Sequence, residues 1–91
     1  MSVYVDDWRQ LATVRNMTSR WSHLTADSEV ELHEFARMLG IPRRAFQSKP
    51  GKPAFDHYDV PDELREKAIG LGAVSLTWRE AARLRRKRFG K

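Results

Sequence analysis

The sequence contains no cysteine, so neither disulfide bonds nor thiolate metal sites can hold the fold together. Its hydrophobic runs all fall short of the roughly 18 residues that a membrane-spanning helix needs. The first seven residues, MSVYVDD, lack the basic start and the apolar middle of a signal peptide. We therefore expect a cytoplasmic protein with no membrane contact.

Two kinds of catalytic or binding motif are also missing. The five glycines are scattered, so no glycine-rich loop can cradle a phosphate. Ser22, Ser28 and Ser75 lack the strand–turn–helix setting of a nucleophilic serine, which argues against serine catalysis. What is present is a chain of 91 residues, 41% of them hydrophobic and three of them Trp, which indicates one small folded domain.

The positive charge is concentrated at the C-terminus. Residues 79–91 contain seven basic side chains and one acid, Glu80, and so carry a net charge of +6. Residues 1–78 contain 10 basic and 11 acidic side chains, a net charge of −1. Any attraction to nucleic acid or to another acidic partner is therefore expected from the last helix.

The first half of the chain predicts two strands and a helix. Residues 2–5 are β-branched and aromatic and run into Asp6-Asp7, which indicates a short strand that ends at two carboxylates. Residues 9–20 show no clear pattern and are expected to form a loop, with or without a short extended piece. Residues 21–26 alternate as a second strand, with Trp21, His23 and Thr25 on one face. A helix follows at 28–39, where Ser28 and Glu31 form a capping box.

The second half predicts a loop, two helices and a third strand. Residues 42–56 hold three of the four prolines and are expected to be mobile or extended. The triplet His57-Tyr58-Asp59 then precedes a helix at 61–71, a buried strand at 73–76 and a last helix from 78 to about 88. Thr77 and Glu80 form a capping box for that helix. Its docked face is expected to contain Trp78, Ala81, Ala82 and Phe89, with Arg85 falling within the apolar side.

This order of elements predicts a small single α/β domain of two or three layers, with a short, mainly parallel sheet and three helices. The domain is expected to span residues 1–82, and residues 83–91 to form the basic end of the last helix and a tail. In parallel sheets the ligand crevice lies beyond the carboxyl ends of the strands. Asp6-Asp7 and Asp27 follow two of the predicted strands and are therefore expected to meet at that edge.

An ordered set of motifs resembles a small bacterial and phage domain family that is catalogued as a domain of unknown function. The motifs are VYVDD at residues 3–7, WSHLTAD at 21–27, ELHEFA at 31–36, FQ at 46–47, HYDV at 57–60 and GAV at 72–74. The likeness runs from about residue 2 to residue 82. It implies a short, stand-alone intracellular α/β protein and no particular activity.

The polar residues at the expected crevice suggest two chemistries. Asp6, Asp7, Asp27 and His57 are candidate ligands for a divalent metal that would activate water for phosphoester hydrolysis. Without a metal, His23 or His57 could act as general base or acid, oriented by Asp59. Tyr58 and Trp21 are the other candidate pocket residues. Both chemistries require His23, His57, Asp6 and Asp59 to converge.

Nucleic-acid contact is the second expectation. The candidate phosphate-binding cations lie on the outer face of the last helix and in the preceding loop: Arg79, Arg83, Arg86, Lys87, Arg43 and Arg44. The leading hypothesis is a domain that binds nucleic acid or a phosphate-bearing ligand through a His/Asp-lined pocket and this basic helix. The alternatives are a metal-dependent phosphoesterase or nuclease that uses the same pocket, and a non-catalytic protein-interaction module that is a possible homodimer.

Overall fold

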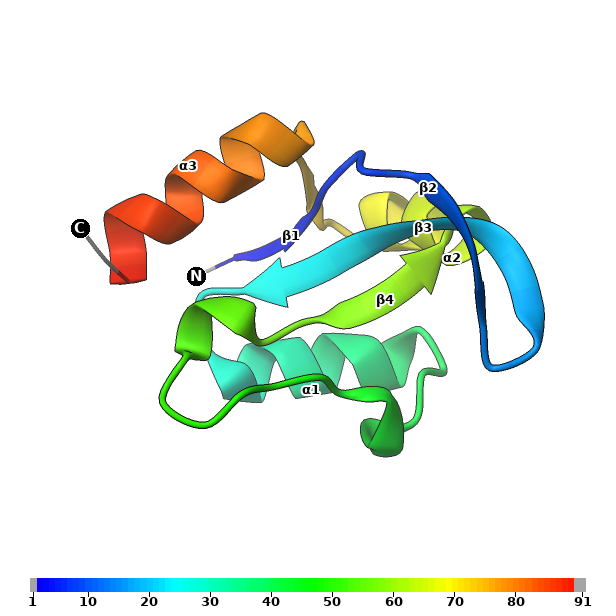
Figure 1. Ribbon diagram of the computed structural model, residues 1–91, viewed down its shortest axis with the longest axis horizontal. Coiled ribbons are helices and arrows are strands. Elements are labelled where there is room, and N and C mark those ends of the chain that lie inside the picture. The colour runs from blue at the N-terminus through cyan, green and yellow to red at the C-terminus, as the bar shows by residue number, and fades with distance from the viewer. Residues whose placement is uncertain (1, 90–91) are drawn as a thin grey trace.

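The computed structural model describes residues 2–89, and the side chains of residues 2–88. Two predictions therefore lie outside the described parts of the chain: the packing of the Phe89 side chain and the tail at residues 90–91. The described chain forms five strands, three α-helices and two short 3₁₀ turns (Figure 1). In chain order these are β1 (Val3–Val5), β2 (Gln10–Val14), β3 (Met17–Ala26), α1 (Glu29–Met38), η1 (Arg43–Ala45), η2 (Pro53–Phe55), β4 (Tyr58–Pro61), α2 (Asp62–Gly70), β5 (Val74–Ser75) and α3 (Trp78–Phe89).

The long strand β3 is the centre of the sheet. On one side it pairs with β2 along its first half and with β1 along its second half, and on the other side it pairs with β4. All three pairings are antiparallel, and within residues 2–89 the one parallel pairing joins β1 to β5. The α/β class and the three helices are confirmed, but the prediction of a mainly parallel sheet is wrong.

The reason is a tight hairpin that the sequence did not reveal. Val14 pairs with Met17, and the two residues between them, Arg15 and Asn16, adopt positive φ angles of 49° and 66°. Two residues with positive φ form the turn type that joins twisted antiparallel strands. The prediction of a loop at residues 9–20 is wrong because β2 is exposed along most of its length, so no alternation of apolar and polar residues marks it as a strand.

The triplet at 57–59 is also part of the sheet. Tyr58 and Asp59 belong to β4 and pair with Leu24 and His23 of β3, while His57 forms an isolated bridge with Gln47. In the sequence this triplet lies between a predicted loop and a predicted helix. A segment of four residues that ends in a proline is too short to show the alternation of a strand. Its backbone N–H and C=O groups find their hydrogen-bond partners only by pairing with β3.

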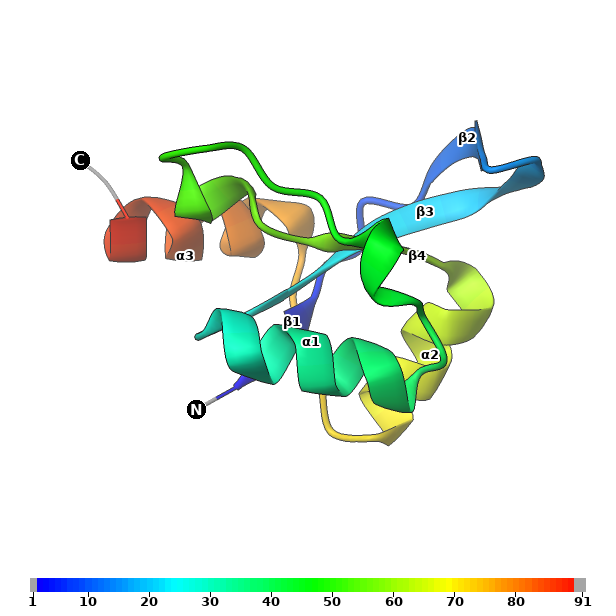
Figure 2. The ribbon, with the colours of Figure 1, turned by 90° about the horizontal axis from the view of Figure 1, so that it is seen from below.

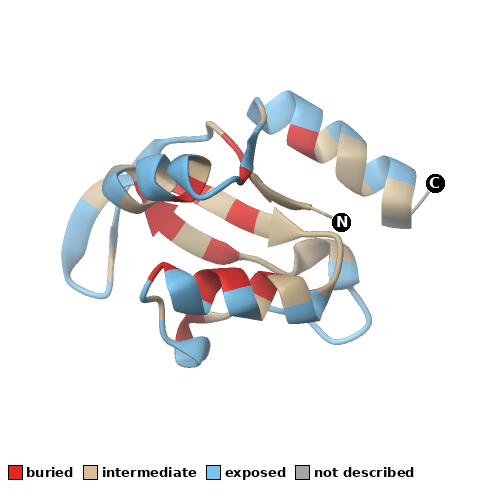
Figure 3. Cartoon of the chain, turned by 180° about the vertical axis from the view of Figure 1, so that it is seen from behind, coloured by how far each residue is buried: buried red, intermediate tan, exposed pale blue. Residues whose placement is uncertain are grey.

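Alternation along β3 and β4 divides the sheet into two faces. Leu24 lies beside Val5 and Tyr58 in register, and these three are almost fully buried. They pack with Leu32 and Ala36 of α1 in the core. Figure 2 shows α1 and α2 on one side of the strands, and η2 and α3 on the other. Figure 3 shows the buried residues gathered on β3, β4 and the inner side of α1.

The local signals for α1 are confirmed. The Ser28 hydroxyl accepts a hydrogen bond from the Glu31 backbone N–H at 3.2 Å and donates to the Glu31 carboxylate at 3.0 Å. At the other end, Gly40 has φ 81° and the Ile41 N–H donates to the Ala36 carbonyl at 2.9 Å. This is the left-handed helix ending that glycine favours because it has no Cβ.

The elements after β4 agree with prediction only in part. The predicted helix at 61–71 forms as Asp62–Gly70, with Ala68 fully buried and Ile69 packed against the core, whereas Leu71 beyond its end is 48% exposed. The predicted buried strand at 73–76 contains the two exposed residues of β5, flanked by the buried Ala73. Among the described residues, no helix has both the length and the apolar character needed to cross a membrane.

Helix α3 docks through its middle rather than through Trp78. The predicted capping box is present, since the Glu80 N–H donates to the Thr77 hydroxyl at 3.1 Å and the Thr77 N–H to the Glu80 carboxylate at 2.8 Å. Trp78 is half exposed, whereas Ala81 is buried and Arg85 is partly buried. Near its end, Arg88 donates to the Ala26 and Asp27 carbonyls at the end of β3.

Candidate functional site

Strand register builds a polar patch on the sheet face that is turned away from the α1–α2 core. His23 of β3 pairs directly with Asp59 of β4. Side chains two residues apart on a strand share a face, so Thr25 lies on the same face as His23, and His57 on the same face as Asp59. The His-x-Asp spacing at 57–59 therefore places both side chains beside His23.

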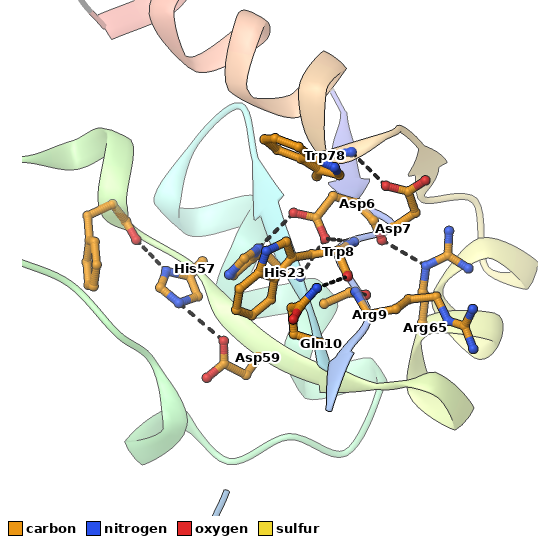
Figure 4. Close-up of polar contacts among 12 residues, drawn as sticks. Asp6, Asp7, Trp8, Arg9, Gln10, His23, His57, Asp59, Arg65 and Trp78 are labelled. Carbon is orange, nitrogen blue, oxygen red and sulfur yellow. Dashed lines mark hydrogen bonds and ion pairs between the residues drawn. The ribbon is translucent and has the colours of Figure 1, made fainter. Parts of the chain in front are cut away.

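Asp6 enters this patch because the chain leaves the ladder between β1 and β2. Its own N–H still donates to the His23 carbonyl at 3.1 Å, but its carboxylate replaces the next ladder partner. One carboxylate oxygen accepts the His23 backbone N–H at 3.0 Å and the Trp8 N–H at 3.1 Å. The other lies 2.8 Å from His23 Nδ1, and Arg65 of α2 donates to the Asp6 carbonyl at 2.8 Å (Figure 4).

His57 is held by groups on both sides of its ring. Nδ1 donates to the backbone carbonyl of Phe55, and Nε2 lies 3.3 Å from the Asp59 carboxylate. The Gln47 side-chain amide donates to the other oxygen of that carboxylate. The His57 side chain is 12% exposed, and the Phe55 ring packs edge-on against it at 5.0 Å. The loop from Gln47 to Phe55 thus helps to position this histidine.

The two histidines face each other. Their ring centroids are 5.1 Å apart in an edge-to-face arrangement, and the Trp8 ring lies 4.9 Å from His23 on another side. One donor atom from each of His23, His57 and Asp59 lies within 4.8 Å of the other two. Of the four residues whose convergence both predicted chemistries require, the structure brings His23, His57 and Asp59 together, and Asp6 is linked to them through its contact with His23.

The pKa values follow from these contacts. Burial opposes ionisation of Asp6, but the hydrogen bonds from the His23 ring, the His23 N–H and the Trp8 N–H outweigh it and lower the pKa of the carboxyl. Asp59 behaves in the same way: burial is outweighed by His57 and Gln47, and its pKa is lowered. Burial disfavours the imidazolium of His57, yet hydrogen bonds to Asp59 and to the Phe55 carbonyl raise its pKa.

Arg85 of α3 completes the site. A pocket of about 150 Å³ is lined by His23, Thr25, Ala54, Phe55, His57 and Arg85. Arg85 has no hydrogen-bond or ion-pair partner within residues 2–88, although it is partly buried. Its position within the apolar side of α3 was the only sequence signal for this role. Gln47 and Phe55 gave no signal, because their contacts depend on how the loop folds back.

Two of the predicted metal ligands lie elsewhere. Asp7 caps α3, with its carboxylate accepting the Trp78 N–H at 2.7 Å. Asp27 lies at the far end of β3, where it accepts hydrogen bonds from the Tyr4 hydroxyl at 2.9 Å and the Ser2 N–H at 2.7 Å. In an antiparallel pair the end of one strand meets the start of the other, so Asp6 and Asp27 fall at opposite ends of β1.

The two other predicted pocket residues are tied to different parts of the sheet. The Tyr58 hydroxyl lies 2.7 Å from His33 Nδ1, on the α1 side. Trp21 is buried, and its indole N–H donates to the Ala12 carbonyl at 2.9 Å. Neither residue lines the pocket that contains His23 and His57.

The predicted phosphate-binding cations lie outside the pocket. Arg79, Arg83, Arg86 and Lys87 are exposed on α3, and the Arg79 guanidinium lies 5.5 Å from the Trp78 ring. Arg43 and Arg44 of η1 are exposed, with Arg43 3.8 Å from Glu29.

Comparison with known proteins gives one match. A family described as "Protein of unknown function (DUF4031)" matches residues 3–88. No curated protein and no solved structure matches the chain.

Proposed function

The chain belongs to this family of proteins of unknown function, and we propose, from the geometry of its site, that the pocket binds a phosphate-bearing ligand. The main support for this proposal is the Arg85 side chain. Its guanidinium is partly buried, has no ion-pair partner in the described chain, and lines the same pocket as His23 and His57. A guanidinium has a fixed fork of donors that matches phosphate oxygens. A partly desolvated cation is also less screened by salt than an exposed one.

Neighbouring groups support an anionic ligand of moderate size. The Thr25 side chain and the His57 ring line the same pocket, and the raised pKa of His57 favours its cationic form. A second hollow of about 180 Å³ shares Thr25, Ala54 and Arg85 with the first, and its wall includes the apolar side chains of Leu76 and Leu84 as well as the charged Asp27, Glu29, Asp56 and Arg88. A phosphate beside Arg85 would leave room there for the rest of the ligand.

The exposed cations of α3 favour a nucleic acid as that ligand. Arg83, Arg86 and Lys87 are exposed on the helix that also carries Arg85, so they could contact further phosphates of the same strand. The Phe55 ring in the pocket wall offers an apolar surface for stacking. Specific contact would come from Arg85, and the outer cations would add attraction that depends on salt.

The test compares Arg85→Ala with Arg86→Ala, which removes a neighbouring, exposed charge on the same helix. Binding of inorganic phosphate and of 5′-phosphorylated and unphosphorylated oligonucleotides is measured in EDTA. We expect Arg85→Ala to weaken binding of phosphate and of the phosphorylated oligonucleotide by about tenfold or more, in keeping with a charged hydrogen bond. Arg86→Ala should leave inorganic phosphate binding within about twofold. Equal losses in the two variants would contradict a pocket site.

Phosphoester hydrolysis in the same pocket is a second candidate function. It is favoured by the His57–Asp59 pair, because His57 in its cationic form is an acid next to the place proposed for the phosphate. In such a reaction a water oxygen attacks phosphorus and releases a proton to solvent, the phosphorus–oxygen bond to the leaving group breaks, and His57 gives the leaving oxygen its proton. The test is cleavage of a dinucleotide phosphodiester, whose alkoxide leaving group needs a proton, with and without divalent ions. Equal rates for the wild type and His57→Gln would exclude this role.

A further inference from the structure

We propose that His23, His57 and Asp59 bind one divalent transition-metal ion, through Nε2 of each imidazole and a carboxylate oxygen. This ligand set differs from the one that the sequence suggested, because Asp7 and Asp27 are engaged elsewhere. The inference extends the proposed function to a metal in the same pocket. It does not depend on phosphate binding, because the three side chains would hold an ion without any other ligand.

The ligands are carried by a rigid part of the fold. His23 and Asp59 are paired residues of two hydrogen-bonded strands, and His57 directly precedes β4 and is bridged to Gln47. Their donor atoms already lie within 4.8 Å of one another. Ligand atoms at about 2.0–2.2 Å from a common ion lie roughly 3–3.5 Å apart, so small side-chain rotations would close the site.

Each of the three side chains also has an outer partner that fixes its orientation. The ionised Asp6 carboxylate can only accept a hydrogen bond, so His23 carries its proton on Nδ1. The Phe55 carbonyl is likewise only an acceptor, so His57 carries a proton on Nδ1 as well. Nε2 is then the nitrogen that would bind a metal in both rings, and an ion bound beside Asp59 would displace the proton that cationic His57 carries on Nε2. Gln47 holds the second oxygen of Asp59. Outer partners of this kind are typical of metal-binding histidines and carboxylates.

The third histidine of the chain shows a different arrangement. Both ring nitrogens of His33 contact groups outside the cluster, Nδ1 the Tyr58 hydroxyl at 2.7 Å and Nε2 Glu29 at 3.0 Å, whereas Nε2 of His57 contacts Asp59, another proposed ligand. His33 lies on α1, on the other side of the sheet from the pocket. It is therefore a matched control for histidine substitutions.

The donor types select the class of ion. Two imidazoles and one carboxylate suit Zn²⁺, Mn²⁺ or Fe²⁺, whereas Mg²⁺ and Ca²⁺ prefer sites made of oxygen ligands. Three protein ligands leave coordination positions open. These would face the pocket that Arg85 also lines, so a water molecule or a phosphate oxygen of the ligand could reach the ion.

The experiment is calorimetric titration with ZnCl₂ and MnCl₂ in a buffer without phosphate. We expect one ion per wild-type chain, an affinity at least about tenfold lower in His57→Ala and in Asp59→Asn, and little change in His33→Gln or Asp56→Asn. Asp56 is a carboxylate in the same loop that is absent from the cluster. Folding of each variant is checked by circular dichroism.

A second measurement needs no variant. Mn²⁺ added to the isotopically labelled wild type should broaden the ring signals of His23 and His57 before those of His33. The absence of saturable binding, unchanged affinity in the folded His57→Ala and Asp59→Asn variants, or first broadening at His33 would each overturn the metal site. Because no phosphate is present here and the phosphate assay is run in EDTA, failure of one proposal is distinguishable from failure of the other.

Discussion

Asp6 contacts His23 at two points, with one carboxylate oxygen on the backbone N–H at 3.0 Å and the other near ring Nδ1 at 2.8 Å. The first contact replaces a ladder hydrogen bond at the point where β1 ends, and the second orients the imidazole. A single buried side chain thereby links sheet integrity to the geometry of the pocket. Its side chain is only 3% exposed, so the loss of either contact leaves a polar group without its partner in a dry environment.

Asp6→Asn is the first variant to make. The amide has one acceptor oxygen where the carboxylate has two, so it cannot serve both the backbone N–H and ring Nδ1–H of His23. We expect a loss of about 1–3 kcal/mol in the free energy of unfolding, measured by urea denaturation. We also expect the His23 proton to move toward Nε2, which ¹⁵N spectra of the ring report. Asp62→Asn is the control, because Asp62 pairs with Arg9 at the surface. Equal costs for the two would refute the role of Asp6.

The lowered pKa of Asp27 predicts how the stability of the fold depends on pH. Burial raises its pKa, but hydrogen bonds from Tyr4 and the Ser2 N–H, with the charge of Arg88, outweigh burial and lower it. A carboxyl whose folded pKa is below its unfolded value of about 3.9 stabilises the fold above that value. This contribution is lost as the pH falls through the folded pKa.

Urea denaturation of the wild type and Asp27→Asn between pH 6 and pH 2.5 checks the sign. The wild type should be the more stable protein at pH 6, and the difference should shrink as the solution becomes acidic. A difference that stays constant over this range would mean that the ionised form of Asp27 does not supply the stabilisation.

Local and long-range signals explain which parts of the fold were predictable. Ser28 with Glu31, and Thr77 with Glu80, are contacts between residues three apart, and both caps form as the sequence indicates. The pairing of β4 with β3 joins residues far apart in the chain, and β4 has only four residues. Nothing within so short a segment identifies its partner strand or the direction of pairing.

The candidate site was predictable in its members more than in its arrangement. His23, His57 and Asp59 were selected by residue type, whereas their common face depends on the register of His23 with Asp59. The expected meeting of Asp6 and Asp27 assumed parallel strands, and it fails because β1 and β3 are antiparallel. Arg85 was noticed only as an exception on the apolar side of its helix. The structure explains this exception, because Arg85 lines the pocket that also contains His23 and His57.

The core and the hairpin should respond very differently to truncation of leucine. Leu24 is fully buried between Val5 and Tyr58, whereas Leu11 on β2 is 64% exposed. We expect Leu24→Ala to lower the free energy of unfolding by about 2–5 kcal/mol, through lost burial and the cavity left behind. Leu11→Ala should change it by about 0.5 kcal/mol or less. Thermal denaturation of both proteins measures the contrast, and a large effect of Leu11→Ala would show that the hairpin packs against something in solution.

The outer cations of α3 should affect the salt dependence of nucleic-acid binding. Arg83 and Arg86 are exposed, so each would contribute mainly by displacing counterions from phosphate. If each contacts one phosphate of a single strand, Arg83→Ala should reduce the slope of log K against log salt by about 0.7. The measurement is fluorescence anisotropy of a labelled single-stranded oligonucleotide at several salt concentrations. Arg37→Ala on α1 is the control, and an equal effect there would indicate diffuse attraction to the whole surface.

The cap of α3 provides a last prediction that separates helix stability from ligand contact. The Thr77 hydroxyl accepts the Glu80 N–H. Thr77 precedes the helix that carries Arg85 and does not line the pocket, so Thr77→Ala changes no pocket side chain. Removing an N-cap costs about 0.5–2 kcal/mol, and because Trp78, Arg79 and Glu80 are exposed and only Ala81 of that turn is buried, the turn should fray. Amide hydrogen exchange should rise at residues 79–82.

Phosphate binding by this variant then tests how Arg85 is held. Arg88 anchors the other end of α3 through the Ala26 and Asp27 carbonyls, so Arg85 should stay in place while the first turn frays. We expect phosphate affinity in Thr77→Ala to fall by less than about threefold. Arg88→Ala releases the end of α3 near Arg85 and should weaken phosphate binding more, because loss of a charged hydrogen bond is worth about 1.5–3 kcal/mol. The opposite order would show that the N-terminal cap, rather than Arg88, fixes the position of Arg85 over His23 and His57.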